Sequence, residues 1–130
     1  MQRHIISHVA IWLLSVIMII FGLQHFINPR GMINYVPPFI PGGIIWVYFA
    51  GAAFILSAIS FLLDKWVKLA AYLLASLLFI FVLTIHLPNY LSAGSVDMQQ
   101  AALVNILKDS AIAAFALHIA GSAHHQKMVY

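Results

Sequence analysis

The sequence predicts an all-α integral membrane protein, an up-down four-helix bundle of transmembrane helices that forms one domain over residues 1–130. Composition is the first reason, because 64% of the residues are apolar and only 7% are charged, against about 45–50% and about 25% in soluble domains. Charge spacing is the second reason, because the six Lys or Arg and three Asp residues separate four long uncharged stretches. A helix needs roughly 20 apolar residues to cross the hydrocarbon core, and lipid offers an open backbone no hydrogen-bond partner.

The first two helices are placed by the charges that flank them. The uncharged stretch between Arg3 and Arg30 predicts a helix over about residues 6–24. Its apolar part is too long for a cleaved signal peptide, so we expect it to remain in the membrane. The stretch between Arg30 and Asp64 holds the second helix, over about residues 44–63, after a proline-rich loop.

The third and fourth helices follow a tight hairpin at residues 64–68. The third covers about residues 69–87, and Pro88 is expected to end or kink it, because proline lacks the N–H that an α-helix needs. The fourth covers about residues 101–121. Asp97 has the spacing of an N-terminal capping box for this helix.

Basic residues predict the orientation. Four of them share the side of the two termini and the short hairpin: Arg3, Lys65, Lys68 and Lys127. The long-loop side holds Arg30 and Lys108. The positive-inside rule therefore predicts that both termini are cytoplasmic. Basic residues form no patch with interleaved aromatic residues, so no nucleic-acid partner is expected.

Polar side chains converge at one depth, near the outer ends of three helices. Lys108 and Asp109 lie inside the fourth helix, and Asn105 lies one turn earlier on the same face. Four further polar residues end the first and third helices at the same level: Gln24, His25, His86 and Asn89. Ionisable groups inside a span favour a functional site. We therefore expect these residues to line one outer-leaflet cavity, with Lys108 and Asp109 as catalytic groups.

Two loop aromatics, Tyr35 and Phe39, are expected to wall this cavity. Structural interpretations stay open for its polar residues. Lys108 and Asp109 could equally form an ion pair without chemistry, His25 could bond a loop carbonyl, and Asn105 could join two helices.

No metal site is predicted. The five histidines other than His25 and His86 lie near the inner helix ends or in the C-terminal tail, where solvated termini explain them. The chain has no Cys, which excludes thiolate metal sites and cysteine nucleophiles. Two histidines from different spans could hold a haem, but nothing in the sequence favours it.

Several blocks together resemble the DoxX family. They are Gly22-Leu-Gln-His-Phe, Tyr35-Val-Pro-Pro-Phe-Ile-Pro, Tyr48-Phe-Ala-Gly-Ala-Ala, His86-Leu-Pro-Asn and Asn105-Ile-Leu-Lys-Asp. The resemblance covers about residues 10–121. It implies a four-helix protein of the bacterial inner membrane with a link to quinone-dependent redox chemistry and oxidative stress. Many DoxX relatives have a Glu in the second helix a few residues after the Tyr-x-x-Gly, and Phe54 occupies that region here. The resemblance therefore does not imply a mechanism that uses this carboxylate.

Three functions follow as expectations. The first is a redox-linked subunit that binds a quinone or similar small amphiphile, with electrons supplied by a partner protein. The second is a non-catalytic assembly protein that holds a membrane partner or a second copy, with Lys108 and Asp109 as a structural pair. In this case, exchanging Lys108 and Asp109 should preserve function. The third, a small-solute transporter, is less favoured, because no pair of broken helices appears.

Overall fold

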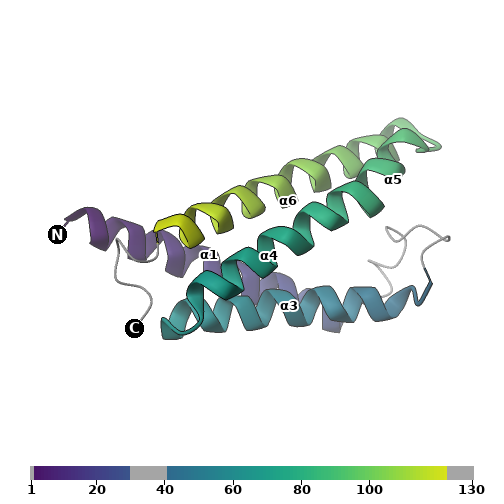
Figure 1. The fold of residues 1–130 in the computed structure, drawn as a ribbon. Helices are drawn as coiled ribbons and strands as arrows, with labels where there is room; N and C mark the ends of the chain where they lie inside the picture. The colour runs from purple at the N-terminus through teal and green to yellow at the C-terminus, as the bar shows by residue number, and fades with distance from the viewer. Residues whose placement is uncertain (1, 30–40, 123–130) are drawn as a thin grey trace.

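The structure, a computed structural model, describes residues 2–29 and 41–122, with side chains from residue 5 onward. Its elements are α1 (Gln2–Ile27), α3 (Ile44–Leu63), α4 (Val67–Phe81), the π-helical turn η1 (Val82–His86), α5 (Leu87–Leu91) and α6 (Val96–Ser122). Together α4, η1 and α5 form one continuous span, so four spans run up and down (Figure 1). Each is long and apolar enough to cross a membrane. The predicted all-α four-helix architecture is confirmed.

The hairpin between α3 and α4 is tighter than the sequence suggested. Asp64 and Trp66 both have left-handed backbone conformations, with φ of 55° and 58°. The N–H of Lys65 donates to the carbonyl of Ser60 at 3.1 Å, which closes the end of α3. Because Trp66 already reverses the chain, α4 begins at Val67, two residues before the predicted start.

The third span continues past Pro88 instead of ending there. The N–H of Leu87 bonds to the carbonyl of Val82, five residues back, and this π-helical bond lets a new helical turn begin. Pro88 then occupies the first turn of α5, where a backbone N–H has no helical partner to lose. The prediction that the helix ends near residue 87 is therefore wrong, and the span runs to Leu91.

A serine, and not the predicted aspartate, caps the fourth span. The Oγ of Ser95 accepts a hydrogen bond from the N–H of Met98 at 3.1 Å. Asp97 lies inside the first turn of α6, where a carboxylate favours the positive end of the helix dipole. The helix accordingly begins at Val96, earlier than predicted.

The four spans form two pairs. α1 packs along α3, and α4 packs along α6, whereas no Cα atom of α1 in the described residues lies within 8 Å of α4 or α6. In Figure 1, α6 and α4 lie above α3 and α1 passes behind, with the α3–α4 hairpin at one end of the bundle and α5 at the other. One apolar core joins them, and its fully buried side chains include Met18, Phe61, Leu74, Leu78 and Ile119. The two-pair arrangement leaves space between the pairs toward the α5 end, where the cavity described next lies.

Candidate functional site

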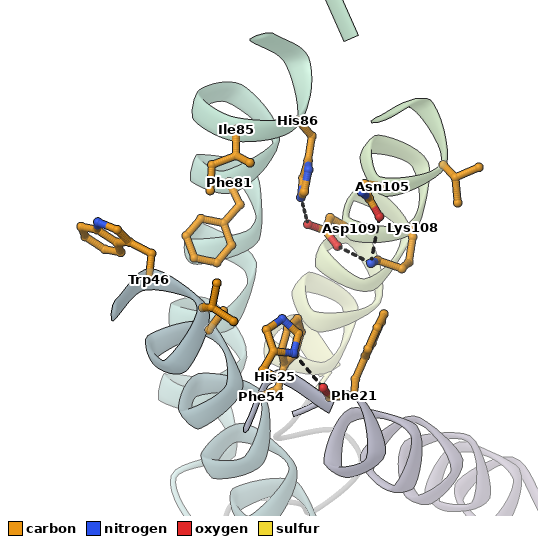
Figure 2. Close-up of a pocket in the computed structure, with 13 residues that line it drawn as sticks. Phe21, His25, Trp46, Phe54, Phe81, Ile85, His86, Asn105, Lys108 and Asp109 are labelled. Atoms are coloured by element: carbon orange, nitrogen blue, oxygen red, sulfur yellow. Dashed lines mark hydrogen bonds and ion pairs between the residues drawn. The ribbon is translucent and has the colours of Figure 1, made fainter. Parts of the chain in front are cut away.

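A cavity of about 400 Å³ lies between the two helix pairs. Its apolar wall consists of Phe21, Trp46, Val47, Ala50, Phe54, Phe81, Ile85 and Val104. Its polar wall consists of His86, Asn105, Lys108 and Asp109, and His25 faces this wall from α1 (Figure 2). All four spans contribute side chains, so the cavity depends on the assembled bundle.

Asp109 is the charged centre of the polar wall and is only 4% exposed. Its Oδ2 lies 2.9 Å from the Nε2 of His86, which joins α6 to the third span. Its Oδ1 lies 3.7 Å from the Nζ of Lys108. A buried charge is tolerated when it is paired and hydrogen-bonded, and removing one partner is costly. The three side chains therefore act as one unit.

The hydrogen bond between His86 and Asp109 also indicates which tautomer His86 adopts. Its Nδ1 is buried and has no partner among the described residues. In a neutral imidazole one nitrogen donates and the other accepts. With Nε2 facing a carboxylate oxygen, a neutral His86 carries its hydrogen on Nε2 and donates it to Asp109, and Nδ1 is then the unprotonated nitrogen.

Lys108 reaches out of this unit toward α1. Its Nζ donates to the Oδ1 of Asn105 at 3.3 Å and lies 4.3 Å from the centroid of the Phe21 ring. An ammonium over an aromatic face is attracted by the electron-rich ring. The side chain is 33% exposed, so the ammonium lines the cavity with part of its surface open.

His25 occupies the opposite wall. Its Nδ1 lies 2.7 Å from the carbonyl oxygen of Phe21, one helical turn earlier. Its ring centroid lies 5.6 Å from that of Phe54, which is buried and stacks at 5.8 Å on Phe21. Phe54, which lies in the region where DoxX relatives often have a Glu, is therefore part of an aromatic wall.

The π-helical turn places His86 on the cavity. Such turns insert one extra residue and often occur at functional sites. Here the turn ends at His86 itself. The hydroxyl of Thr84 donates to the carbonyl of Ile80 at 2.7 Å within the same stretch.

The predicted site residues fall into three groups. The structure brings His25, His86, Asn105, Lys108 and Asp109 together around one cavity. Gln24 is exposed, and neither Gln24 nor Asn89 lines the cavity. Gln24 neighbours His25 on α1, so its side chain leaves the helix in another direction. Tyr35 and Phe39 lie outside the described residues.

The sequence did not predict the apolar wall. Phe21 lies one turn before His25, and Val47, Ala50 and Phe54 recur at helical spacing on α3. Such residues look the same whether they face lipid, a core or a cavity. The spacing of Phe21 from His25 was the only local signal.

A family model described as "Domain of unknown function (DUF8561)" matches residues 14–120. The chain belongs to this family. The match covers all the cavity residues named above. No curated protein and no solved structure matches the chain significantly.

The resemblance to the DoxX family is therefore wrong, because the matching family is a different one. The blocks that suggested it are short runs at helix ends, in a proline-rich loop and around an interhelical amide. Residues of these kinds have the same physical roles in many small membrane bundles. The implications that rested only on that resemblance lose their support.

Proposed function

We propose that this protein binds a quinone or a similar small amphiphile between its two helix pairs, as a redox-linked membrane subunit. The observation that carries the proposal is the cavity itself, which joins an aromatic wall to a compact set of polar side chains within a membrane-spanning bundle. Ligand sites are typically cavities of about 300–1,000 Å³, apolar with a few polar groups. The cavity volume of about 400 Å³ fits one ring-sized head group.

The polar wall suits a head group with ring oxygens. Lys108 has an ammonium that is partly open to the cavity, and it donates hydrogen bonds to oxygen acceptors. Negative charge on such an oxygen would be stabilised by this cation in surroundings of low polarity. The adjoining Asp109–His86 pair provides a carboxylate and an imidazole, the groups that move protons most readily.

We also propose that both termini lie in the cytoplasm, which the distribution of basic residues favours. Lys65 and Lys68 lie at the α3–α4 hairpin, on the same side as the start of α1 and the end of α6. The cavity lies toward the other side, near the end of α1 and the start of α3. With this orientation the head group would bind in the outer leaflet.

A second candidate is a non-catalytic assembly protein, and a groove favours it. This groove of about 530 Å³ lies between α3 and α4, and its lining combines large apolar side chains such as Phe49 and Trp66 with a set of small ones: Ala52, Ala53, Ser57, Ser60, Ala70 and Ser76. Small residues let transmembrane helices approach closely. If the function is to hold a partner helix in this groove, the Lys108–Asp109 pair has only a structural role.

Ligand binding tests the first candidate directly. Trp46 lines the cavity, and its indole N–H donates to the carbonyl of Pro41 at 2.6 Å. In a variant with Trp12→Phe and Trp66→Phe, Trp46 is the remaining tryptophan, since the chain has three. Titration in nanodiscs with short-tailed ubiquinone or menaquinone should quench its fluorescence in a saturable way.

Matched variants make this titration decisive. Lys108→Met should weaken binding about 10-fold or more, because a charged hydrogen bond is lost. Lys68→Met should not, because Lys68 is exposed and lies outside the cavity. Quenching that never saturates, or that responds equally to both variants, would exclude the proposal. A stoichiometric protein partner with no bound small molecule would favour the assembly candidate.

A further inference from the structure

The two ring nitrogens of His25 have different roles. Nδ1 lies 2.7 Å from the carbonyl oxygen of Phe21. A carbonyl oxygen only accepts hydrogen bonds, so Nδ1 must carry a hydrogen and donate. The other nitrogen, Nε2, has no hydrogen-bond partner within the part of the chain that the structure describes. Figure 2 shows it pointing into the space between the helix pairs.

The imidazole is held in this position from three sides. The Phe21 carbonyl fixes Nδ1, and the Phe54 ring lies 5.6 Å from the imidazole centroid. On the third side, the Cβ of His25 is so close to Gly51 that a Cβ added there would lie 2.8 Å away. Nε2 is therefore held in place before any ligand arrives, which reduces the entropy lost on binding.

The uncharged form of His25 costs less in this place. Its ring lies against those of Phe21 and Phe54, where an unpaired charge is strongly disfavoured. The Lys108 ammonium also disfavours a second positive charge, and the Asp109 carboxylate acts in the opposite sense, but burial is the largest effect. With Nδ1 protonated and the ring neutral, Nε2 presents a lone pair to the cavity. Across the cavity, Lys108 presents an ammonium that can only donate.

We infer that the cavity selects head groups that carry a hydroxyl, such as a phenol or a hydroquinone, over those that carry only carbonyl or ether oxygens. The hydroxyl donates its hydrogen bond to Nε2 of His25, while an oxygen of the same head group accepts from Lys108. A carbonyl oxygen facing Nε2 would set two lone pairs against each other. The inference rests on the proposed function and deepens it, because it predicts that the reduced form of a quinone binds more tightly than the oxidised form.

A matched pair of ligands tests the hydroxyl preference. Para-heptylphenol and its methyl ether share the ring and the tail, but only the phenol donates a hydrogen bond. Calorimetric titration of the protein in nanodiscs, with empty nanodiscs subtracted, should show about 2- to 10-fold tighter binding of the phenol. His25→Phe should remove this preference. His8→Phe, in the inner half of α1, should retain it.

A second measurement uses the unaltered protein, so it does not depend on the folding of the His25 variant. In histidine labelled with nitrogen-15, Nε2 of His25 should resonate as an unprotonated nitrogen. Its signal should move toward that of a hydrogen-bonded nitrogen when the phenol is added, and stay in place with the ether. The signals of His25 are assigned in the unaltered protein by the correlation of its Nδ1 with the labelled carbonyl carbon of Phe21, whose oxygen lies 2.7 Å from Nδ1.

The outcomes separate the two ideas. If phenol and ether bind equally while both are weakened by Lys108→Met, the hydroxyl preference is overturned and the proposed cavity function stands. An Nε2 signal that is already protonated in the free protein also overturns the preference. If phenol, ether and quinone all fail to saturate, the proposed function itself is overturned.

Discussion

Gly22 of α1 and Gly51 of α3 face each other so closely that a Cβ placed on Gly22 would lie 2.8 Å from the carbonyl oxygen of Gly51. This contact lets the two backbones approach, as small residues do in transmembrane helix pairs. His25 lies less than one turn after Gly22, and it packs against Gly51 from the same side. The glycine contact thus sets both the α1–α3 packing and the position of a cavity residue.

Gly51→Ala should therefore disturb stability and binding together. The new Cβ would lie 2.8 Å from the Cβ of His25 and 3.0 Å from the carbonyl oxygen of Gly22. Since neither neighbour is a flexible side-chain end, the helices must separate, at a cost of about 1–3 kcal/mol. Thermal unfolding in detergent measures this loss, and calorimetry measures the weakened phenol binding. Gly121→Ala is the control, because nothing lies within 4 Å of its added Cβ. Equal stability of the two variants would show that α1 and α3 do not approach as closely at Gly22 and Gly51 as described.

Lys108 and Asp109 are neighbours in sequence, but their side chains have different surroundings. Asp109 is buried against His86, whereas Lys108 extends over Phe21 toward the cavity. Exchanging them by Lys108→Asp with Asp109→Lys would bury an ammonium beside the imidazole and place a carboxylate over an aromatic face. We expect the exchanged variant to lose about 3–5 kcal/mol of stability, the cost of breaking a buried pair.

Unfolding measurements on the exchanged variant and on Asp109→Asn check this prediction. Asp109→Asn keeps the shape and some hydrogen bonding, so it should be the less damaging change. Wild-type stability of the exchanged variant would instead support the interpretation in which the pair is structural and its order is immaterial.

Phe21 provides both apolar packing and a cation–π contact, and a leucine at this position would keep only the apolar packing. It stacks on Phe54 at 5.8 Å and lies beneath the Lys108 ammonium at 4.3 Å. Phe21→Leu keeps an apolar side chain but removes the cation–π contact, which is worth about 0.5–2 kcal/mol. Quinone titration should show several-fold weaker binding in this variant, because Lys108 loses the contact that holds its ammonium in place. Phe26→Leu, which removes an aromatic ring stacked on Tyr48 outside the cavity, should leave the affinity unchanged.

Much of the fold was predictable, because charge spacing and hydropathy determine which stretches can enter lipid. The second helix was predicted with its observed bounds, residues 44–63. The end of the third span was not predicted correctly, because a proline normally ends an α-helix. Here a π-helical turn precedes Pro88, and the span continues beyond it. Such a turn depends on how the extra residue packs, and local propensity does not reveal that.

The polar half of the cavity was also predictable, because a charge inside a span has to face other polar groups. Asn105, Lys108 and Asp109 lie within two turns of each other on α6. His25 and His86 lie near the ends of their own spans, at the same depth, and line the same cavity. The aromatic half was not predictable. Phe54 and Phe81 look like lipid-facing residues until the pairing of α1 with α3 and of α4 with α6 is known.

The orientation in the membrane can be tested with single cysteines, because the chain has none of its own. Gly94→Cys lies in the exposed turn between α5 and α6, where nothing lies within 4 Å of an added Cβ. Lys65→Cys lies in the exposed hairpin at the other end of the bundle. The positive-inside rule predicts that a membrane-impermeant maleimide labels Gly94→Cys in intact cells. Lys65→Cys should be labelled only after the membrane is opened. Lys65→Cys removes one basic residue, but Lys68 and the others on the hairpin side still outnumber those on the long-loop side, so the orientation should not change. The reverse labelling pattern would put both termini outside and the cavity in the inner leaflet, and the proposed binding of a head group from the outer leaflet would be wrong.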